Sequence, residues 1–156
     1  MSDEDAPPRM CFACGNANER GLHMTFRQEG DRTICDYTPC AYQQGYPGRM
    51  HGGVVSTLID ESMGWAVYHA KQWGATARLN IRYRRPVDLA QTLRIEAWVV
   101  KERGRLMELR AEVSGEDGTL LAEGDGVFMR LDAPLSNEMS DLARRNGRDD
   151  APEVVT

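Results

Sequence analysis

The chain has 156 residues and a formal net charge of −5 at pH 7, which together favour one acidic domain with its own hydrophobic core. The acidic balance argues against a general nucleic-acid-binding protein. No apolar run approaches the roughly 20 residues of a membrane span, and the polar, proline-bearing start does not resemble a signal peptide. We therefore expect a cytoplasmic protein that has neither a membrane nor a nucleic acid as its partner.

The first third of the chain predicts a flexible start, two strands and a loop. Residues 1–10 are polar and contain prolines, so we expect them to be flexible. Apolar and polar side chains alternate over 22–27, which predicts a strand, and a second strand is predicted over 33–38 after a turn at Gly30. The stretch 39–50 is rich in turn-forming residues and predicts a loop.

A long, mostly apolar helix is predicted over 52–70, with Gly74 ending it. After it, apolar residues alternate with polar ones in four consecutive strands at hairpin spacing, the last over 119–131. A single helix that is apolar on most sides has to be wrapped, and a curved sheet can wrap it. We therefore expect an α+β fold, a long central helix in a curved, mainly antiparallel sheet of about six strands. Residues 132–156 are expected to form a polar, partly disordered tail with a short helix at 136–146.

Two glycines open the predicted helix, and two carboxylates lie near its middle. Glycine destabilises helices, so Gly52 and Gly53 indicate that another group approaches the backbone closely there. The N-terminus of a helix offers free N–H groups and partial positive charge, which suit a developing oxyanion. Asp60 and Glu61 lie among apolar residues, where a carboxylate suits a base or a nucleophile. The combination predicts an acyl-transfer site.

Asp60 is the favoured catalytic carboxylate of the two. Its neighbours at four-residue spacing are Gly52, Ser56 and Gly64, and with Asp60 they form what we call the small-residue face of the helix. This face leaves room for a ligand or for the backbone of a partner. Glu61 points about 100° away around the helix, and we expect it to pair with an arginine unless it is itself the catalytic group.

The four cysteines do not form a complete metal site in the sequence. Cys11 and Cys14 have the spacing of half a zinc site, but no second pair with that spacing follows. Cys35 lies in a strand-like run, Cys40 follows a proline, and His23 is the only histidine near the first pair. We therefore expect a structural turn with reduced cysteines and no bound metal.

The order of the predicted elements and three motifs resemble the hotdog fold of PaaI-like acyl-CoA thioesterases, the phenylacetate-degradation type. The CFACG of residues 11–15 resembles the opening of many small members of this family. The GYPGRMHGG of 45–53, followed by Asp60, is similar to their active-site loop and helix. The LNIRYRRPV of 79–87 is similar to their first strand after the helix. The resemblance spans residues 11–131 and implies one hotdog thioesterase domain there.

The resemblance also assigns roles to individual residues. It implies that Asp60 is the nucleophile or general base and that the backbone N–H of Gly52 polarises the thioester carbonyl. Many members carry an Asn or Gln seven residues before that glycine, where this chain has Gly45. Gln44 would take this water-positioning role if the loop were shifted by one residue. No metal or redox cofactor is implied, because coenzyme A is part of the substrate.

Further residues are expected to contact the substrate. Arginines after the helix form the densest basic patch of the chain, and arginine suits the nucleotide phosphates of coenzyme A, although a solvated strand face remains the alternative. A histidine before the helix is expected to shape the loop and cap the helix start. The expected substrate-binding residues are His51, Gly53, Ser56, Gly64, Arg78, Arg82 and Arg84.

Three functions fit these features. The first is hydrolysis of an acyl-CoA thioester through Asp60 and Gly52. The second is an acyl-thioester hydratase or dehydratase, in which His51 would be essential. The third is a module that binds or senses acyl-CoA without turnover.

Helix geometry also predicts the assembly. Gly52 and Asp60 are eight residues apart, so their backbones lie about 12 Å apart along the axis at ~1.5 Å per residue. Reacting groups have to come within about 3–3.5 Å of one carbonyl, which one helix cannot easily achieve with both. Two antiparallel copies around a two-fold axis can do so, and we expect a homodimer with two shared active sites. The family resemblance adds a tetramer of two such dimers as the alternative.

Overall fold

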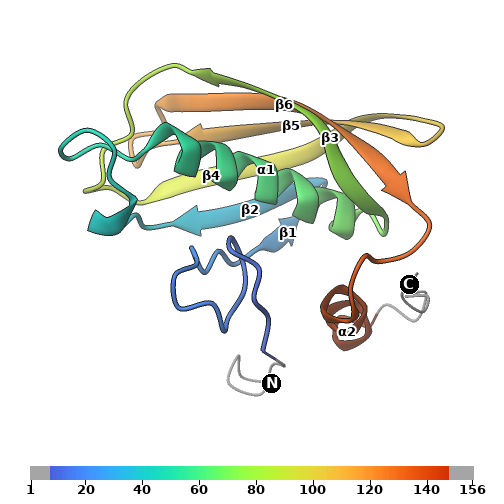
Figure 1. Cartoon of the computed structure of the whole chain (residues 1–156). Helices are drawn as coiled ribbons and strands as arrows, with labels where there is room; N and C mark the ends of the chain where they lie inside the picture. Colours follow the sequence, from blue (N-terminus) through green and yellow to red (C-terminus); the bar gives the residue numbers. More distant parts are fainter. Residues whose placement is uncertain (1–7, 148–156) are drawn as a thin grey trace.

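The computed structural model describes residues 8–147 and shows one six-stranded antiparallel sheet around a long helix (Figure 1). The strand order is β1-β2-β4-β5-β6-β3, so β1 and β3 form the edges of the sheet. The expected α+β architecture, a long central helix in a curved, antiparallel six-stranded sheet, is confirmed. The elements in chain order are β1 (Arg27–Glu29), β2 (Arg32–Tyr37), the 3-10 helix η2 (Ala41–Gln43), α1 (Gly52–His69), β3 (Trp73–Tyr83), β4 (Leu93–Arg103), β5 (Leu106–Ser114), β6 (Leu120–Leu131) and α2 (Asn137–Arg145).

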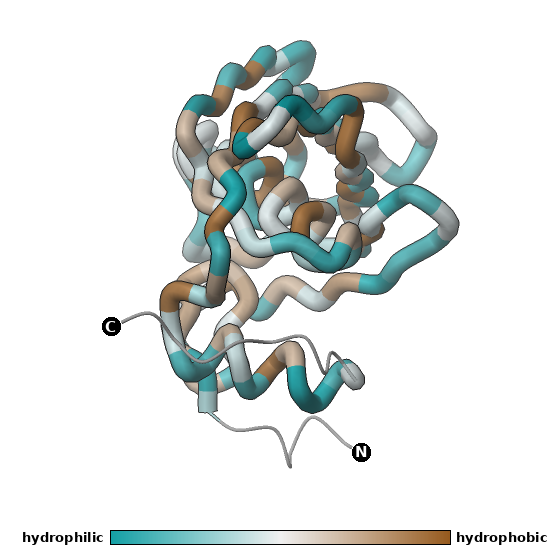
Figure 2. Tube along the Cα trace, turned by 90° about the vertical axis from the view of Figure 1, so that its right-hand side faces the viewer, coloured by the Kyte–Doolittle hydropathy of each residue, from teal (hydrophilic) through white to brown (hydrophobic). Residues whose placement is uncertain are grey.

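The concave side of the sheet encloses α1, which contacts the five strands β2 to β6. The view roughly along α1 in Figure 2 shows the chain curving round the helix. Alternation along each strand sends every second side chain to this core, as Leu93, Ile95 and Ala97 of β4 illustrate with no exposed surface. The buried side of α1 is formed by Val55, Leu58, Ile59 and Met63, among others. Burial of these apolar side chains is the main stabilising contribution to the fold.

Glycines of β6 set how closely the helix approaches the sheet. A Cβ on Gly124 would lie 2.7 Å from Cγ2 of Ile59, and a Cβ on Gly126 would lie 2.7 Å from Sδ of Met63. These positions have to be glycine because the α1 side chains occupy the space of a β-carbon. The position of α1, and with it the small-residue face, is therefore set by this contact.

The strand expected over 22–27 is wrong, because only Arg27 of that stretch belongs to a strand. Leu22 and Met24 are buried, but their N–H groups donate to the carbonyls of Phe12 and Ala13, at 2.8 and 2.9 Å. His23 between them has a φ of 53°, which no strand residue adopts. The alternation of apolar and polar residues correctly predicted which side chains are buried. The backbone of Leu22 and Met24, however, forms its hydrogen bonds with the N-terminal loop and not with a neighbouring strand.

The prediction that Gly74 ends the helix is also wrong. Helix α1 ends at His69, and Lys71, with a φ of 63°, turns the chain directly into β3. Gly74 lies within β3, where a Cβ would come 2.9 Å from Cε of Met107. This glycine therefore serves close packing in the sheet and not a helix end.

The short helix expected near the C-terminus is present as α2. It packs through Ala143 against Tyr68 and Trp73, beside the end of α1. Neither helix of the described residues is long and apolar enough to cross a membrane. The expected flexibility of the two ends falls in part on 1–7 and 148–156, which lie outside the described residues.

Candidate functional site

The start of α1 carries a backbone N–H that no described residue uses. His51 is the N-cap, and its Nδ1 accepts a hydrogen bond from Gly53 N–H at 2.9 Å. The His51 carbonyl accepts from the N–H groups of Val54 and Val55. Within residues 8–147 the N–H of Gly52 has no hydrogen-bond partner. It is thus a free donor at the positive end of the helix.

Tyr83 of β3 holds the other side of this helix start. Its hydroxyl donates to the Gly52 carbonyl at 2.9 Å and lies 2.6 Å from Oγ of Ser56. The Ser56 hydroxyl also donates to the Gly52 carbonyl, at 3.1 Å. Beside these groups lies a cavity of about 310 Å³. It is lined by Met50, Gly52, Val55, Tyr83, Arg84, Arg85, Pro86 and Val87.

Asp60 lies two turns further along the same face. Its Oδ1 accepts a hydrogen bond from the hydroxyl of Thr76, at 2.8 Å, and its side chain is partly buried. A β-bulge in β3 between Thr76 and Arg78 keeps Thr76 and the later Tyr83 turned toward α1. A Cβ on Gly64, one turn on, would find its nearest neighbour 4.0 Å away, at Phe128. The small-residue face therefore lies along the edge strand β3.

The side-chain amide of Gln44, expected to position water, and that of its neighbour Gln43 are both occupied by loop contacts. Oε1 of Gln44 accepts from Gly48 N–H at 2.8 Å, and the side chain is exposed. Gln43 donates to the Tyr37 hydroxyl at 2.5 Å and accepts from Cys40 N–H at 3.1 Å. Both side chains shape the turn before α1. Gln44 as a water-positioning group remains a prediction.

The arginines expected to bind coenzyme A fall into two places. Arg84 lines the cavity beside Gly52 and forms an ion pair with Glu123 at 2.8 Å. Arg78 and Arg82 are exposed and line a separate groove of about 400 Å³ together with Glu108 and other residues of β5 and β6. Of these three arginines, Arg84 is therefore the one near the helix start of its own chain, where Arg85 lines the same cavity.

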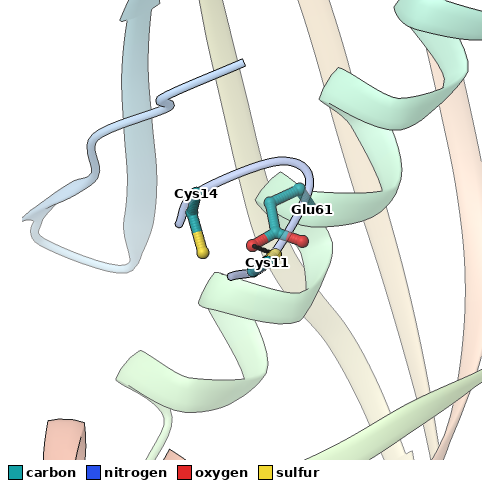
Figure 3. Close-up of side chains that lie close together, drawn as sticks. All are labelled: Cys11, Cys14 and Glu61. Atoms are coloured by element: carbon teal, nitrogen blue, oxygen red, sulfur yellow. Dashed lines mark hydrogen bonds between the residues drawn. The ribbon is translucent and has the colours of Figure 1, made fainter. Parts of the chain in front are cut away.

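A second group of reactive side chains lies on another side of α1. Cys11, Cys14 and Glu61 point toward one another, and their ligand atoms all lie within 4.8 Å (Figure 3). Sγ of Cys11 lies 3.7 Å from Oε1 of Glu61, and Trp65 Nε1 donates to the same oxygen at 3.2 Å. The expectation that Glu61 pairs with an arginine is wrong, because the N-terminal loop covers it. The spacing of the cysteines was a partial signal, but nothing local in the sequence connects them to Glu61.

Burial and hydrogen bonds shift the pKa values in this group. Desolvation is the main cause that raises the pKa of Glu61 to about 7. The hydrogen bond from the Cys14 thiol, with further hydrogen bonds from backbone N–H groups, lowers the pKa of Cys11 to about 5. Because Cys14 donates that bond and is itself buried, the pKa of Cys14 is raised. The arrangement thus favours a thiolate at Cys11.

Comparisons with known proteins agree with this fold. A family model of the thioesterase superfamily matches residues 47–122. The chain is 37% identical over 140 residues to acyl-coenzyme A thioesterase THEM4 of Bos taurus, an alignment that covers 88% of this chain and 58% of that protein. The chain spans about half the length of the curated relatives it matches.

Two solved structures have a similar fold. A thioesterase superfamily protein, 27% identical, superposes with a TM-score of 0.75 over 78% of this chain and 60% of that one. The PaaI protein of E. coli, from the phenylacetic acid degradation operon, has the same fold at 18% identity. Its TM-score is 0.66, and 70% of this chain and 80% of that chain are covered. From its sequence match and its fold, the chain belongs to the hotdog thioesterase superfamily, with the PaaI-like type among its structural neighbours.

Proposed function

We propose that the protein hydrolyses an acyl-CoA thioester to a free acid and coenzyme A. The observation that carries the proposal is the small-residue face, on which a free N–H of Gly52 and the carboxylate of Asp60 both lie along β3. The name of the THEM4 relative supports the substrate class.

The chemistry follows from these two groups. Asp60 attacks the thioester carbonyl, or takes a proton from a water that attacks it, and the carbonyl oxygen becomes an oxyanion. The Gly52 N–H, at the positive end of α1, stabilises that oxyanion. Collapse of the intermediate breaks the C–S bond, and the coenzyme A thiolate leaves and takes up a proton. If Asp60 is the nucleophile, the acyl group is left as an anhydride on its carboxylate, and water then hydrolyses this anhydride to the free acid and regenerates Asp60. These steps require no metal or redox cofactor, and coenzyme A enters only as part of the substrate.

The active site is shared between two subunits in this proposal. The eight-residue separation of Gly52 and Asp60 places them about 12 Å apart on one helix, too far for one carbonyl. Strand β3, with 11 residues, has an unpaired edge within the described chain, and such an edge is commonly covered by a partner. A two-fold axis beside β3 would bring Gly52 of one subunit to Asp60 of the other, and two such dimers would form a tetramer.

The phosphates of coenzyme A are assigned to the arginines. Arg84 lies at the cavity beside the helix start, whereas Arg78 and Arg82 stand further along β3 on its outer side. His51 and Gly53 shape the entrance, and their mutual hydrogen bond occupies Nδ1 of His51. That contact supports a capping role and does not favour a hydratase in which His51 is the base. All four cysteines are free thiols, which supports the proposed cytoplasmic location.

A panel of acyl-CoA thioesters with detection of released thiol tests the proposal. Short, long, branched and aromatic acyl groups should be assayed together, with 2-enoyl-CoA absorbance followed in parallel. Thiol release well above the rate without protein, for at least one acyl group, is the expected result. Binding of acyl-CoA without thiol release, or hydration of the enoyl group without it, would reject hydrolysis in favour of one of the other two functions.

A further inference from the structure

The cysteine pair of the N-terminal loop and Glu61 of α1 form a site that the proposed hydrolysis does not use. Cys11 and Cys14 come from the loop, and Glu61 comes from the middle of the helix, 50 and 47 residues later. The three residues open onto a cavity of about 330 Å³ between the loop, α1 and α2. Trp65, Tyr68, Met139 and Leu142 supply much of its apolar wall.

The backbone of the loop holds both sulfur atoms toward Glu61. Gly15 N–H donates to the Cys11 carbonyl at 2.8 Å and closes the turn. A Cβ on Gly15 would lie 2.5 Å from that same oxygen, so the turn requires glycine after Cys14. Leu22, which follows this turn in the chain, also binds the loop: its backbone N–H donates to the Phe12 carbonyl at 2.8 Å. The relative positions of the two sulfurs are therefore built into the fold.

The donors around the cluster suit anionic ligands. The sulfur atoms of Cys11 and Cys14 lie within 4.8 Å of each other and of a carboxylate oxygen of Glu61. The indole of Trp65 orients the Glu61 carboxylate, as groups behind metal ligands commonly do. No cationic side chain among residues 8–147 forms an ion pair with Glu61. Glu61 is thus a partly buried carboxyl group without an ion-pair partner among the described residues.

We propose that Cys11, Cys14 and Glu61 bind one Zn²⁺ ion, with a fourth coordination position open toward the cavity that α2 borders. In a tetrahedral zinc site, with bonds of about 2.0–2.3 Å, ligand atoms are about 3.3–3.8 Å apart. The 3.7 Å between Cys11 Sγ and Glu61 Oε1 matches this, and the other ligand atoms, which all lie within 4.8 Å, have to approach by at most about 1 Å. Two thiolates select zinc over calcium or magnesium, which prefer oxygen ligands alone.

The ion would fasten the N-terminal loop to α1 one residue after Asp60. The sequence did not predict such a site, because no second pair of cysteines with this spacing follows the first. The third ligand is a carboxylate that only the packing of the loop on the helix brings to the sulfurs. A three-ligand site keeps one position for water, unlike a closed four-ligand structural site.

Metal binding by the full chain tests the proposal directly. The purified protein should be treated with Zn²⁺ or Co²⁺, freed of excess metal by gel filtration, and analysed for bound metal per chain. We expect about one ion per chain and, with Co²⁺, a near-ultraviolet thiolate-to-cobalt charge-transfer band. Cys11→Ser, Cys14→Ser and Glu61→Gln should each bind Zn²⁺ at least about tenfold more weakly, whereas the matched control Cys40→Ser should bind like wild type.

The spectrum of wild-type protein keeps the test decisive even if a cysteine variant fails to fold. No retained metal, or bound Co²⁺ without the charge-transfer band, would overturn the proposal. So would undiminished binding in a folded Cys11→Ser, Cys14→Ser double variant. If mass spectrometry instead shows that oxidised glutathione links Cys11 to Cys14 in a disulfide, and no metal is bound under reducing conditions, the pair is a redox pair and the zinc site is rejected.

Discussion

Two neighbouring carboxylates of α1, Asp60 and Glu61, have very different surroundings. Asp60 faces the edge strand β3, where a neutral hydroxyl of Thr76 is its partner. Glu61 faces the N-terminal loop, where two thiols and an indole surround it and burial raises its pKa to about 7. A turn of about 100° around the helix separates the two environments. The comparison teaches that the role of a helical carboxylate is decided by the element packed against it.

The largest expected effect is on the Asp60 side. Asp60→Asn should reduce hydrolysis of acyl-CoA by at least about 10²–10⁴-fold, because the amide can act neither as base nor as nucleophile. Thiol release measures the rate, and Asp141→Asn, an exposed carboxylate on α2, is the matched control. The same variant should bind Zn²⁺ like wild type, whereas Glu61→Gln should bind it more weakly. Wild-type turnover by Asp60→Asn would remove Asp60 from the mechanism.

A comparable loss is expected at the first residue of α1. Gly52→Pro removes the free N–H, and proline is accepted at this helix position because His51 before it is already extended, with ψ at 134°. We expect kcat to fall by about 10²–10³.

Gly52→Ala is the matched control, because it keeps the N–H and its Cβ would lie 3.5 Å from the Tyr83 ring, an ordinary contact. Equal activity of the alanine and proline variants, with circular dichroism showing both folded, would exclude Gly52 as the oxyanion donor.

Mixing the two inactive variants tests whether the site is shared. Co-expressed Asp60→Asn and Gly52→Pro chains should recover about a quarter of wild-type activity. This follows because half of randomly formed dimers are mixed and each mixed dimer has one intact site of two. Native mass spectrometry checks that mixed dimers form. Mixed dimers without activity, or a fully active monomer, would show that each chain works alone.

A smaller effect is expected on the outer side of β3. Arg82→Ala should raise the KM for an acyl-CoA about tenfold while changing the KM for the matching acyl-pantetheine thioester much less, because only the former carries the nucleotide phosphates. Arg84→Ala tests the arginine already paired with Glu123, and we expect a weaker effect there. Equal changes for both substrates would show that these arginines do not bind the nucleotide.

The smallest effect is expected from the partner of Asp60. Thr76→Val removes the hydroxyl that donates to Oδ1 and keeps the branched shape of the side chain. The loss of one hydrogen bond that orients the carboxylate should lower kcat by roughly 3–10-fold. Thr57→Val, a hydroxyl on α1 that donates only to its own helix at Gly53, is a matched control that should change kcat little.

Local patterns in the sequence were enough to predict most of the fold. Each of the strands β4, β5 and β6 alternates apolar with polar residues, and α1 is a single apolar helix. These patterns reflect the side chains that each element turns toward the core, so they can be recognised without knowing which element packs against it. The same applies to the glycines at the start of α1, which mark a helix end with free N–H groups. The alternation over 22–27 correctly predicted that Leu22 and Met24 are buried. It did not predict that their backbone N–H groups bind the N-terminal loop instead of a strand.

Contacts between distant segments required the tertiary structure. The sequence alone determined that Asp60 shares a face with Gly52, because helix periodicity is a local property. It could not determine that β3 covers this face, that Gln43 and Gln44 are bound within their own loop, or that the N-terminal cysteines meet Glu61. Those outcomes depend on which surfaces pack together, and packing is decided by the shape and burial of the whole chain.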